Sequence, residues 1–176
     1  MFRTAASATL FCLAMLCGCL AAGADVLDKS AAGFTVRHSV VVPVPANAAW
    51  AKFIDVAAWW GNDHTFSGSA ANLKLDAAAG GCFCETLAGG GSVMHLRVVD
   101  AQPNEMLRLV GALGPLQPLA VQGTLSVAFK TVEGGTEVTL TYAVGGYLPG
   151  GLQDWAPPVD GMFAGQVQHF RQQFPK

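Results

Sequence analysis

The sequence has few charged residues and no run of basic ones. Lys and Arg number 10 and Asp and Glu number 12 among 176 residues, for a formal net charge of −2. Proteins that hold nucleic acid or an anionic membrane by charge carry a basic patch or stripe. This composition therefore speaks against binding to nucleic acid or to an anionic membrane surface by charge.

Cysteine is scarce outside the N-terminal segment, where three of the five cysteines lie, leaving Cys82 and Cys84. Structural zinc sites place a second ligand cluster elsewhere in the chain, so this pair, even with His95, predicts no metal site and no cofactor. On an extended strand the Cα atoms of two such cysteines lie about 6.6 Å apart, near the outer limit for a disulfide. We therefore expect free or core thiols, with a disulfide as the alternative.

The N-terminal segment is typical of a secretory signal peptide. Arg3 supplies a positive charge, residues 8–20 are predominantly apolar, and residues 22–24 fit a small-residue cleavage site. The apolar run is shorter than the roughly 20 residues that span a membrane. We expect cleavage after Ala24 and a periplasmic or secreted protein. The alternative is a lipoprotein processed at Cys19, the one form for which membrane attachment is expected.

No internal repeat or low-complexity tract divides the rest of the chain, whose length suits one domain. Residues 25–33 form a polar, alanine-rich lead, and the domain extends over residues 34–174. Its first strand, residues 34–42, is followed by a helix with Trp50, Phe53, Ile54 and Ala57 on one face. Alternating apolar residues then predict strands at 73–75, 82–87, 93–100, 106–110, 121–131 and 136–144, before a C-terminal amphipathic helix.

This order of elements predicts an α+β fold, with helices on one face of a curved antiparallel sheet of about six to seven strands. Residues 113–120, which contain two prolines, cannot belong to a central strand and are predicted as a loop over the sheet. A long helix across a curved sheet commonly leaves an apolar cavity, and such clefts are ligand sites.

Four short motifs stand at the ends of these elements: Pro45-x4-Trp50, Asp55-x3-Trp59-Trp60, Gly80-Gly81-x-Phe83 and Val98-Val99-Asp100-x2-Pro103. Together they resemble the START-like superfamily, also called SRPBCC. Within it, the chain is most similar to the branch of polyketide cyclases and activator-of-heat-shock-ATPase-like proteins. The likeness covers about residues 34–174, nearly everything that follows the signal.

The resemblance implies a helix-grip fold, in which the sheet wraps around the C-terminal helix and a deep pocket lies between them. Members mostly bind lipids, sterols, polyketides or other apolar molecules, and some are cyclases, aromatases or dehydratases. They share no universal catalytic motif, so no catalytic residue is carried over. This chain departs from the family in its expected export and in a short final helix containing Gly161 and Gly165, which favours a more open pocket.

Three functions follow as alternatives. The first is an exported protein that binds a hydrophobic small molecule or lipid between sheet and helix. The second is a cyclase or dehydratase that uses a pocket carboxylate or histidine as acid and base. The third, a module acting on a heat-shock ATPase, conflicts with export because that partner is cytosolic. A binding protein is favoured over an enzyme, and no protein partner is predicted.

The strand at residues 82–87 carries the candidate chemistry. Alternation places Phe83 and Glu85 on one face and both cysteines on the other. If Phe83 faces the core, as the resemblance implies, Glu85 points into the pocket with His95 or Arg97 opposite. Burial would raise the pKa of such a carboxylate and suit it to acid-base chemistry, whereas an arginine would hold it ionised. A structural pair, a solvated face and a thiol nucleophile with His95 as base are the other interpretations.

The remaining candidates are aromatic or polar side chains near the expected pocket. Those that follow the first helix lie at the pocket mouth or fill the core. Tyr147 lies in a glycine-rich loop where a mobile gate is expected. Glu85 and His95 are the candidates for catalysis. The full set of predicted ligand-binding residues is Trp59, Trp60, His64, Phe66, Phe83, Glu85, His95, Arg97, Tyr142, Tyr147 and Phe163.

Overall fold

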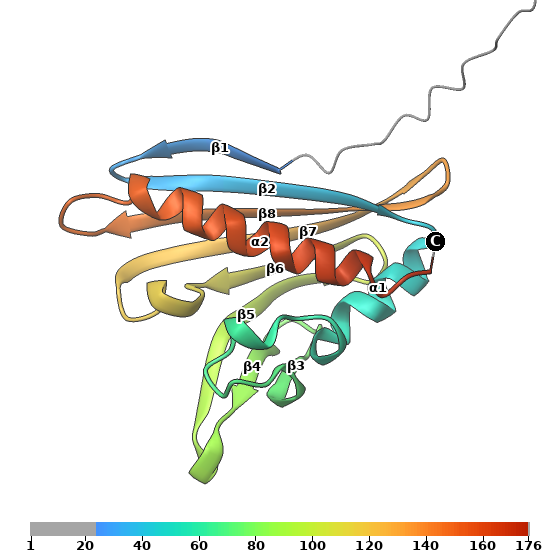
Figure 1. Cartoon of the computed structure of the whole chain (residues 1–176), viewed down its shortest axis with the longest axis horizontal. Helices are drawn as coiled ribbons and strands as arrows, with labels where there is room; N and C mark the ends of the chain where they lie inside the picture. The colour runs from blue at the N-terminus through green and yellow to red at the C-terminus, as the bar shows by residue number, and fades with distance from the viewer. Residues whose placement is uncertain (1–23, 176) are drawn as a thin grey trace, which may run out of the picture.

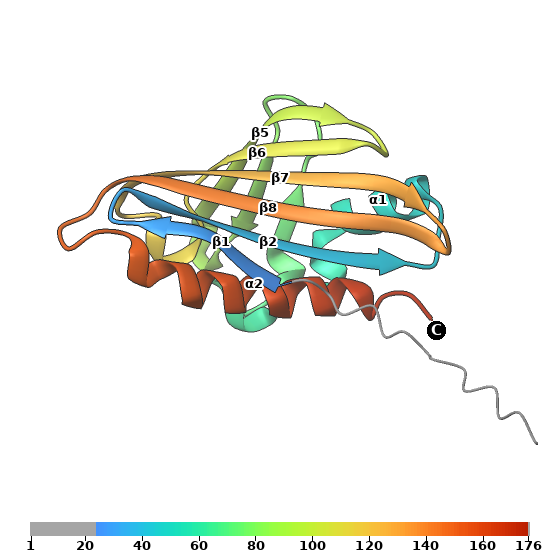
Figure 2. The ribbon, with the colours of Figure 1, turned by 90° about the horizontal axis from the view of Figure 1, so that it is seen from above.

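The computed structural model of the chain describes residues 24–175. Apart from Ala24, the predicted signal peptide lies outside the described residues, as does the alternative lipidation site at Cys19. The described part is an α+β fold with one eight-stranded antiparallel sheet in the order β1-β2-β8-β7-β6-β5-β4-β3 and a C-terminal helix (Figures 1 and 2). This architecture confirms the predicted fold class and is compatible with a helix-grip fold. No helix among the described residues is long and apolar enough to cross a membrane.

The sheet has one strand more than the sequence predicted, and most of its strands are longer than predicted, although β4 is one residue shorter. The stretch expected as an unstructured lead pairs with the next strand and forms an edge of the sheet. Val26 packs against the core there while Leu27, Asp28 and Lys29 are exposed, so its apolar pattern is too weak to reveal a strand. The strands are β1 Ala24–Ser30, β2 Gly33–Val42, β3 Leu73–Leu75, β4 Cys82–Thr86, β5 Ser92–Gln102, β6 Met106–Gly111, β7 Ala120–Val132 and β8 Gly135–Tyr147.

Two helices cover the sheet. Helix α1, Ala46–Ile54, begins directly after Pro45 and buries Trp50 and Phe53 as predicted, but it ends before Ala57, which lies in a 3-10 turn. Helix α2, Ala156–Arg171, runs along the long strand β2 and also contacts β1 (Figure 1). The stripe that the sequence predicts is buried, and it comprises Val159, Phe163, Gln166, Val167, Phe170 and, beyond the helix, Phe174; Ala156 is buried as well.

Aromatic rings join the two helices at one end of the core. The ring centroids of Phe53 and Trp59 lie 5.2 Å apart, and Trp59 and Phe170 follow at 5.3 Å. Such tilted and edge-to-face pairs contribute about 0.5–1.5 kcal/mol each beyond their burial. They fill this end of the space between the sheet and α2, and a cavity lies toward the other end of the helix.

Candidate functional site

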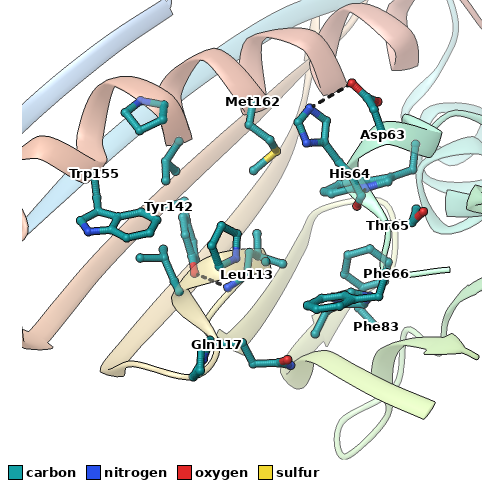
Figure 3. Close-up of a pocket in the computed structure, with 18 residues that line it drawn as sticks. Asp63, His64, Thr65, Phe66, Phe83, Leu113, Gln117, Tyr142, Trp155 and Met162 are labelled. Atoms are coloured by element: carbon teal, nitrogen blue, oxygen red, sulfur yellow. Dashed lines mark hydrogen bonds and ion pairs between the residues drawn. The ribbon is translucent and has the colours of Figure 1, made fainter. Parts of the chain in front are cut away.

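A cavity of about 840 Å³ lies between α2, the sheet and two loops (Figure 3). Its volume is within the range of roughly 300–1,000 Å³ that is typical of small-molecule sites. Most of the lining is apolar or aromatic. The lining residues are Trp60, Asp63, His64, Thr65, Phe66, Phe83, His95, Leu113, Gly114, Pro115, Leu116, Gln117, Pro118, Tyr142, Trp155, Pro158, Val159 and Met162.

The loop that follows α1 forms one rim of the cavity and is held at both ends. The backbone N–H of Gly61 donates to Oε1 of Gln166, a fully buried residue of α2, over 2.8 Å. A Cβ atom at Gly61 would lie 2.6 Å from an Asp63 carboxylate oxygen and 3.1 Å from Nε2 of Gln166, so a larger residue would displace the Asp63 side chain. At the far end, the backbone N–H groups of Phe66 and Ser67 donate to the Glu85 carboxylate. The rim is thus tied to both α2 and β4.

The loop after β6 forms the opposite wall, a role that the sequence analysis did not assign to it. Leu113–Pro118 line the cavity around a single 3-10 turn, and Leu116 is almost completely buried. Pro115 and Pro118 correctly indicated a loop. The sequence signal for its place in the site was its apolar content, since a solvent-facing loop seldom carries three leucines, here Leu113, Leu116 and Leu119.

A β-bulge turns His95 toward the cavity. In a regular strand His95 and Arg97 share one face, with Leu96 and Val98 on the other. The register between β4 and β5 slips between Phe83 and Cys84, so Phe83 pairs with Leu96 and Cys84 with Met94. His95 and Leu96 are consequently both buried, while Arg97 is exposed on the outer face. The bulge therefore decides which of the two predicted partners meets Glu85.

The structure overturns the prediction for the cysteines. Cys82 and Cys84 form a disulfide, with Cα atoms 5.4 Å apart instead of the spacing expected for a regular strand. The backbone of β4 is therefore contracted here, and the distance lies within the usual range for a disulfide. The pair lies on the side of β4 opposite the buried Phe83 and Glu85, as the alternation predicted, and away from the cavity lining.

Glu85 and His95 form a buried pair. Nε2 of His95 lies 2.9 Å from an Oε atom of Glu85, and the two side chains are 5% and 0% exposed. Burial alone would raise the pKa of Glu85, but hydrogen bonds from Ser67, Phe66 and His95 outweigh it and lower that pKa. Burial lowers the pKa of His95 against the opposing influence of Glu85. The pair is therefore a carboxylate that holds a neutral imidazole near neutral pH.

Most other polar groups of the lining are either exposed or already bonded within the protein. Asp63 and His64 face each other at the rim with a nitrogen-to-oxygen distance of 3.6 Å (Figure 3), and both are exposed. The Tyr142 hydroxyl accepts from the backbone N–H of Leu113 and donates to the Gly111 carbonyl. Its burial raises the pKa of Tyr142 to about 12.

The structure brings six of the eleven predicted residues together on the lining. These are Trp60, His64, Phe66, Phe83, His95 and Tyr142. Glu85 lies against His95 without reaching the lining, because its oxygens are occupied by the rim loop and the imidazole. The others lie elsewhere: Trp59 in the aromatic core with Nε1 bonded to the Phe53 carbonyl, Phe163 buried against Tyr142, Arg97 outside, and Tyr147 73% exposed. Tyr147 ends β8, where the sequence predicted a mobile loop.

The lining residues that sequence reasoning missed come mainly from the start of α2 and the loop after β6. Trp155, Pro158 and Met162 project from the first turns of the helix region, beside the predicted stripe residue Val159. Their contribution depends on how α2 sits on the sheet, which no local pattern specifies. Among the described residues, no group of three or more His, Cys, Asp or Glu side chains is placed to hold a metal ion.

Comparison with known proteins supports the fold alone. No family model matches the chain, and no curated protein is similar to it in sequence. Among solved structures it is similar to SA2116 from Staphylococcus aureus, a protein of unknown function (TM-score 0.57, 14% identity, 80% of this chain and 92% of that one). It is also similar to MLL2253 from Mesorhizobium loti (TM-score 0.56, 14% identity, 78% and 94%). A third structure, DynU16 of the dynemicin biosynthetic locus, has a TM-score of 0.54 at 18% identity over 78% of this chain and 46% of that one.

Proposed function

We propose that this chain is an exported START-like protein that binds a hydrophobic small molecule or lipid in the cavity beneath α2. The observation that carries the proposal is the cavity itself, which is large enough for such a ligand and lined mostly by apolar and aromatic side chains. A neighbour from a biosynthetic locus with the same fold is compatible with an apolar natural product as ligand.

Export is part of this proposal. The N-terminal segment has the composition of a signal peptide. The Cys82–Cys84 disulfide supports the same conclusion, because disulfides persist in oxidising compartments and are rare in the cytosol. Detection of the processed chain in the periplasm or medium, with Asp25 as its first residue, is the expected result. A cytoplasmic chain that retains its first 24 residues would contradict it.

The binding proposal is tested with an apolar fluorescent probe, N-phenyl-1-naphthylamine, and with native mass spectrometry of protein purified from its own compartment. We expect saturable binding of one probe per chain, and a co-purified apolar molecule. Met162→Trp, which fills the cavity, should weaken probe binding at least tenfold by steric exclusion. The matched control is Met94→Trp, because Met94 is 56% exposed outside the lining. Equal loss in both variants, or no saturable binding by the native protein, would contradict the proposal.

A second candidate is an enzyme of the cyclase or dehydratase type, and the Glu85–His95 pair is the observation that favours it. A neutral imidazole on an apolar cavity, oriented by a carboxylate, is suited to removing a weakly acidic C–H proton. Exchange of the α-protons of 2-tetralone in D2O, followed by NMR, measures this directly. An exchange rate above that in buffer alone, lost in His95→Phe, would support the enzyme. An exchange rate equal to that in buffer would contradict the enzyme and leave the binding function as the proposal.

A further inference from the structure

One ring nitrogen of His95 is committed within the protein and the other is not. Nε2 is bonded to Glu85. Nδ1 has no hydrogen-bond partner among the described residues. The fully buried side-chain atoms that lack a partner there are Oε1 of Gln153 and Nε2 of Gln166, so Nδ1 is not fully enclosed by protein. Since His95 is only 5% exposed and lines the cavity, the access that Nδ1 retains is to the cavity.

The hydrogen-bond network determines which nitrogen carries the proton. The Glu85 carboxylate receives the backbone N–H groups of Phe66 and Ser67, which can only donate. As an ionised acceptor it can take a further hydrogen bond only from a donor, so Nε2 of His95 carries hydrogen. In the neutral imidazole Nδ1 is then a lone-pair acceptor.

The imidazole is also fixed in place. The Phe83 ring lies 4.9 Å from the His95 ring, centroid to centroid, and the Phe66 ring lies 5.7 Å away, both inclined by less than 40°. Together with the Glu85 bond, these rings hold the acceptor in one orientation. A preorganised acceptor in an apolar site discriminates strongly between ligands that have a hydrogen-bond donor and ligands that lack one, because the acceptor is left unpaired when the donor is missing.

We propose that Nδ1 of His95 accepts a hydrogen bond from a hydroxyl group of the ligand, which makes the ligand class an apolar alcohol or phenol and not a hydrocarbon or ester. Glu85 is the positioning residue that sets the tautomer. This inference rests on the proposed binding function. A cationic group placed against His95 is disfavoured, because one neutral acceptor among aromatic rings does not compensate an ammonium group for lost water.

Two probes of nearly equal shape test the inference: 2-naphthol, which has a hydroxyl group, and 2-methoxynaphthalene, which lacks the donor. We expect the native protein to bind 2-naphthol about tenfold more tightly, as one buried hydrogen bond allows. If only the transfer of the probe from water to an apolar cavity mattered, 2-methoxynaphthalene would bind more tightly, because the ether is the more hydrophobic molecule. In His95→Phe the preference should reverse, while His169→Phe, on α2 outside the cavity lining, should keep it.

A measurement on the native protein keeps the test independent of how the variants fold. Imidazole ¹⁵N NMR should show His95 with hydrogen on Nε2, and 2-naphthol should shift the Nδ1 resonance while 2-methoxynaphthalene does not. Binding of both probes with the ether favoured and Nδ1 unmoved would overturn this inference and leave the binding function intact. Hydrogen on Nδ1 in the free protein would overturn it as well. Failure of both probes to bind would overturn the proposed binding function itself.

Discussion

Glu85 on β4 and His95 on β5 meet through a 2.9 Å hydrogen bond because a bulge places His95 and its neighbour Leu96 on the same side of the sheet. The carboxylate also receives two backbone N–H groups from the loop that rims the cavity. The Glu85 carboxylate therefore both orients the imidazole and anchors the loop, so a change at Glu85 should affect the stability of the site and the state of His95 together.

Replacing Glu85 with Gln should lower the free energy of unfolding by about 2 kcal/mol. The substitution removes the charge from a buried acceptor and so weakens the hydrogen bonds that the carboxylate accepts. Urea unfolding measures the loss. A positioning role predicts a second effect, a rise in the population of His95 with hydrogen on Nδ1, observable by imidazole ¹⁵N NMR. A destabilised variant with an unchanged tautomer would limit Glu85 to anchoring the loop.

Acidification should destabilise the protein in two stages. The pKa of His95 is lowered by folding, so the unfolded chain takes up a proton first, below the ordinary value of about 6.5, and stability falls as the pH decreases. The pKa of Glu85 is also lowered, so a second loss begins below about 4.5. Urea unfolding at a series of pH values measures both.

The His95→Phe variant separates this effect from other titrating groups. The difference in unfolding free energy between the native protein and the variant should shrink as the pH falls below about 6.5. A difference that stays constant, or grows in acid, would be incompatible with a lowered His95 pKa.

The Cys82–Cys84 disulfide should contribute only modestly to stability. It closes a loop of three residues, for which chain entropy predicts about 1.5 kcal/mol. Reduction of the native protein and the double change Cys82→Ala and Cys84→Ala should lower the free energy of unfolding by similar amounts, and reductant should not affect the double variant. Reaction of two thiols in the denatured, unreduced mature protein would show that the bond is absent.

Leu116 should anchor the cavity wall after β6. It is 1% exposed, so Leu116→Ala should lower the free energy of unfolding by about 3 kcal/mol and weaken probe binding by loosening residues 113–118. Leu27, which is 44% exposed on β1, is the matched control, and Leu27→Ala should change stability by less than about 0.5 kcal/mol. Similar losses in both variants would refute the anchoring role.

Local patterns determined the fold class and much of the lining. The period-two alternation of β7 and β8, the one-sided stripe of α2 and the opposite faces of Phe83 and Cys84 are set by backbone geometry, so the sequence predicts them directly. Of the clustered aromatics after α1, Trp60 and Phe66 lie on the cavity lining, whereas Trp59 lies in the core.

Only the tertiary structure decided the details on which the chemistry depends. The bulge that turns His95 inward arises from a slip in pairing between two strands, and neither strand predicts it from its own sequence. The short Cα–Cα distance of the Cys82–Cys84 disulfide is also visible only in the structure. The edge strand β1 and the cavity wall at Leu113–Pro118 likewise depend on distant segments for their partners. Sequence patterns report which face of an element is apolar; which side chains then meet is settled by long-range pairing and packing.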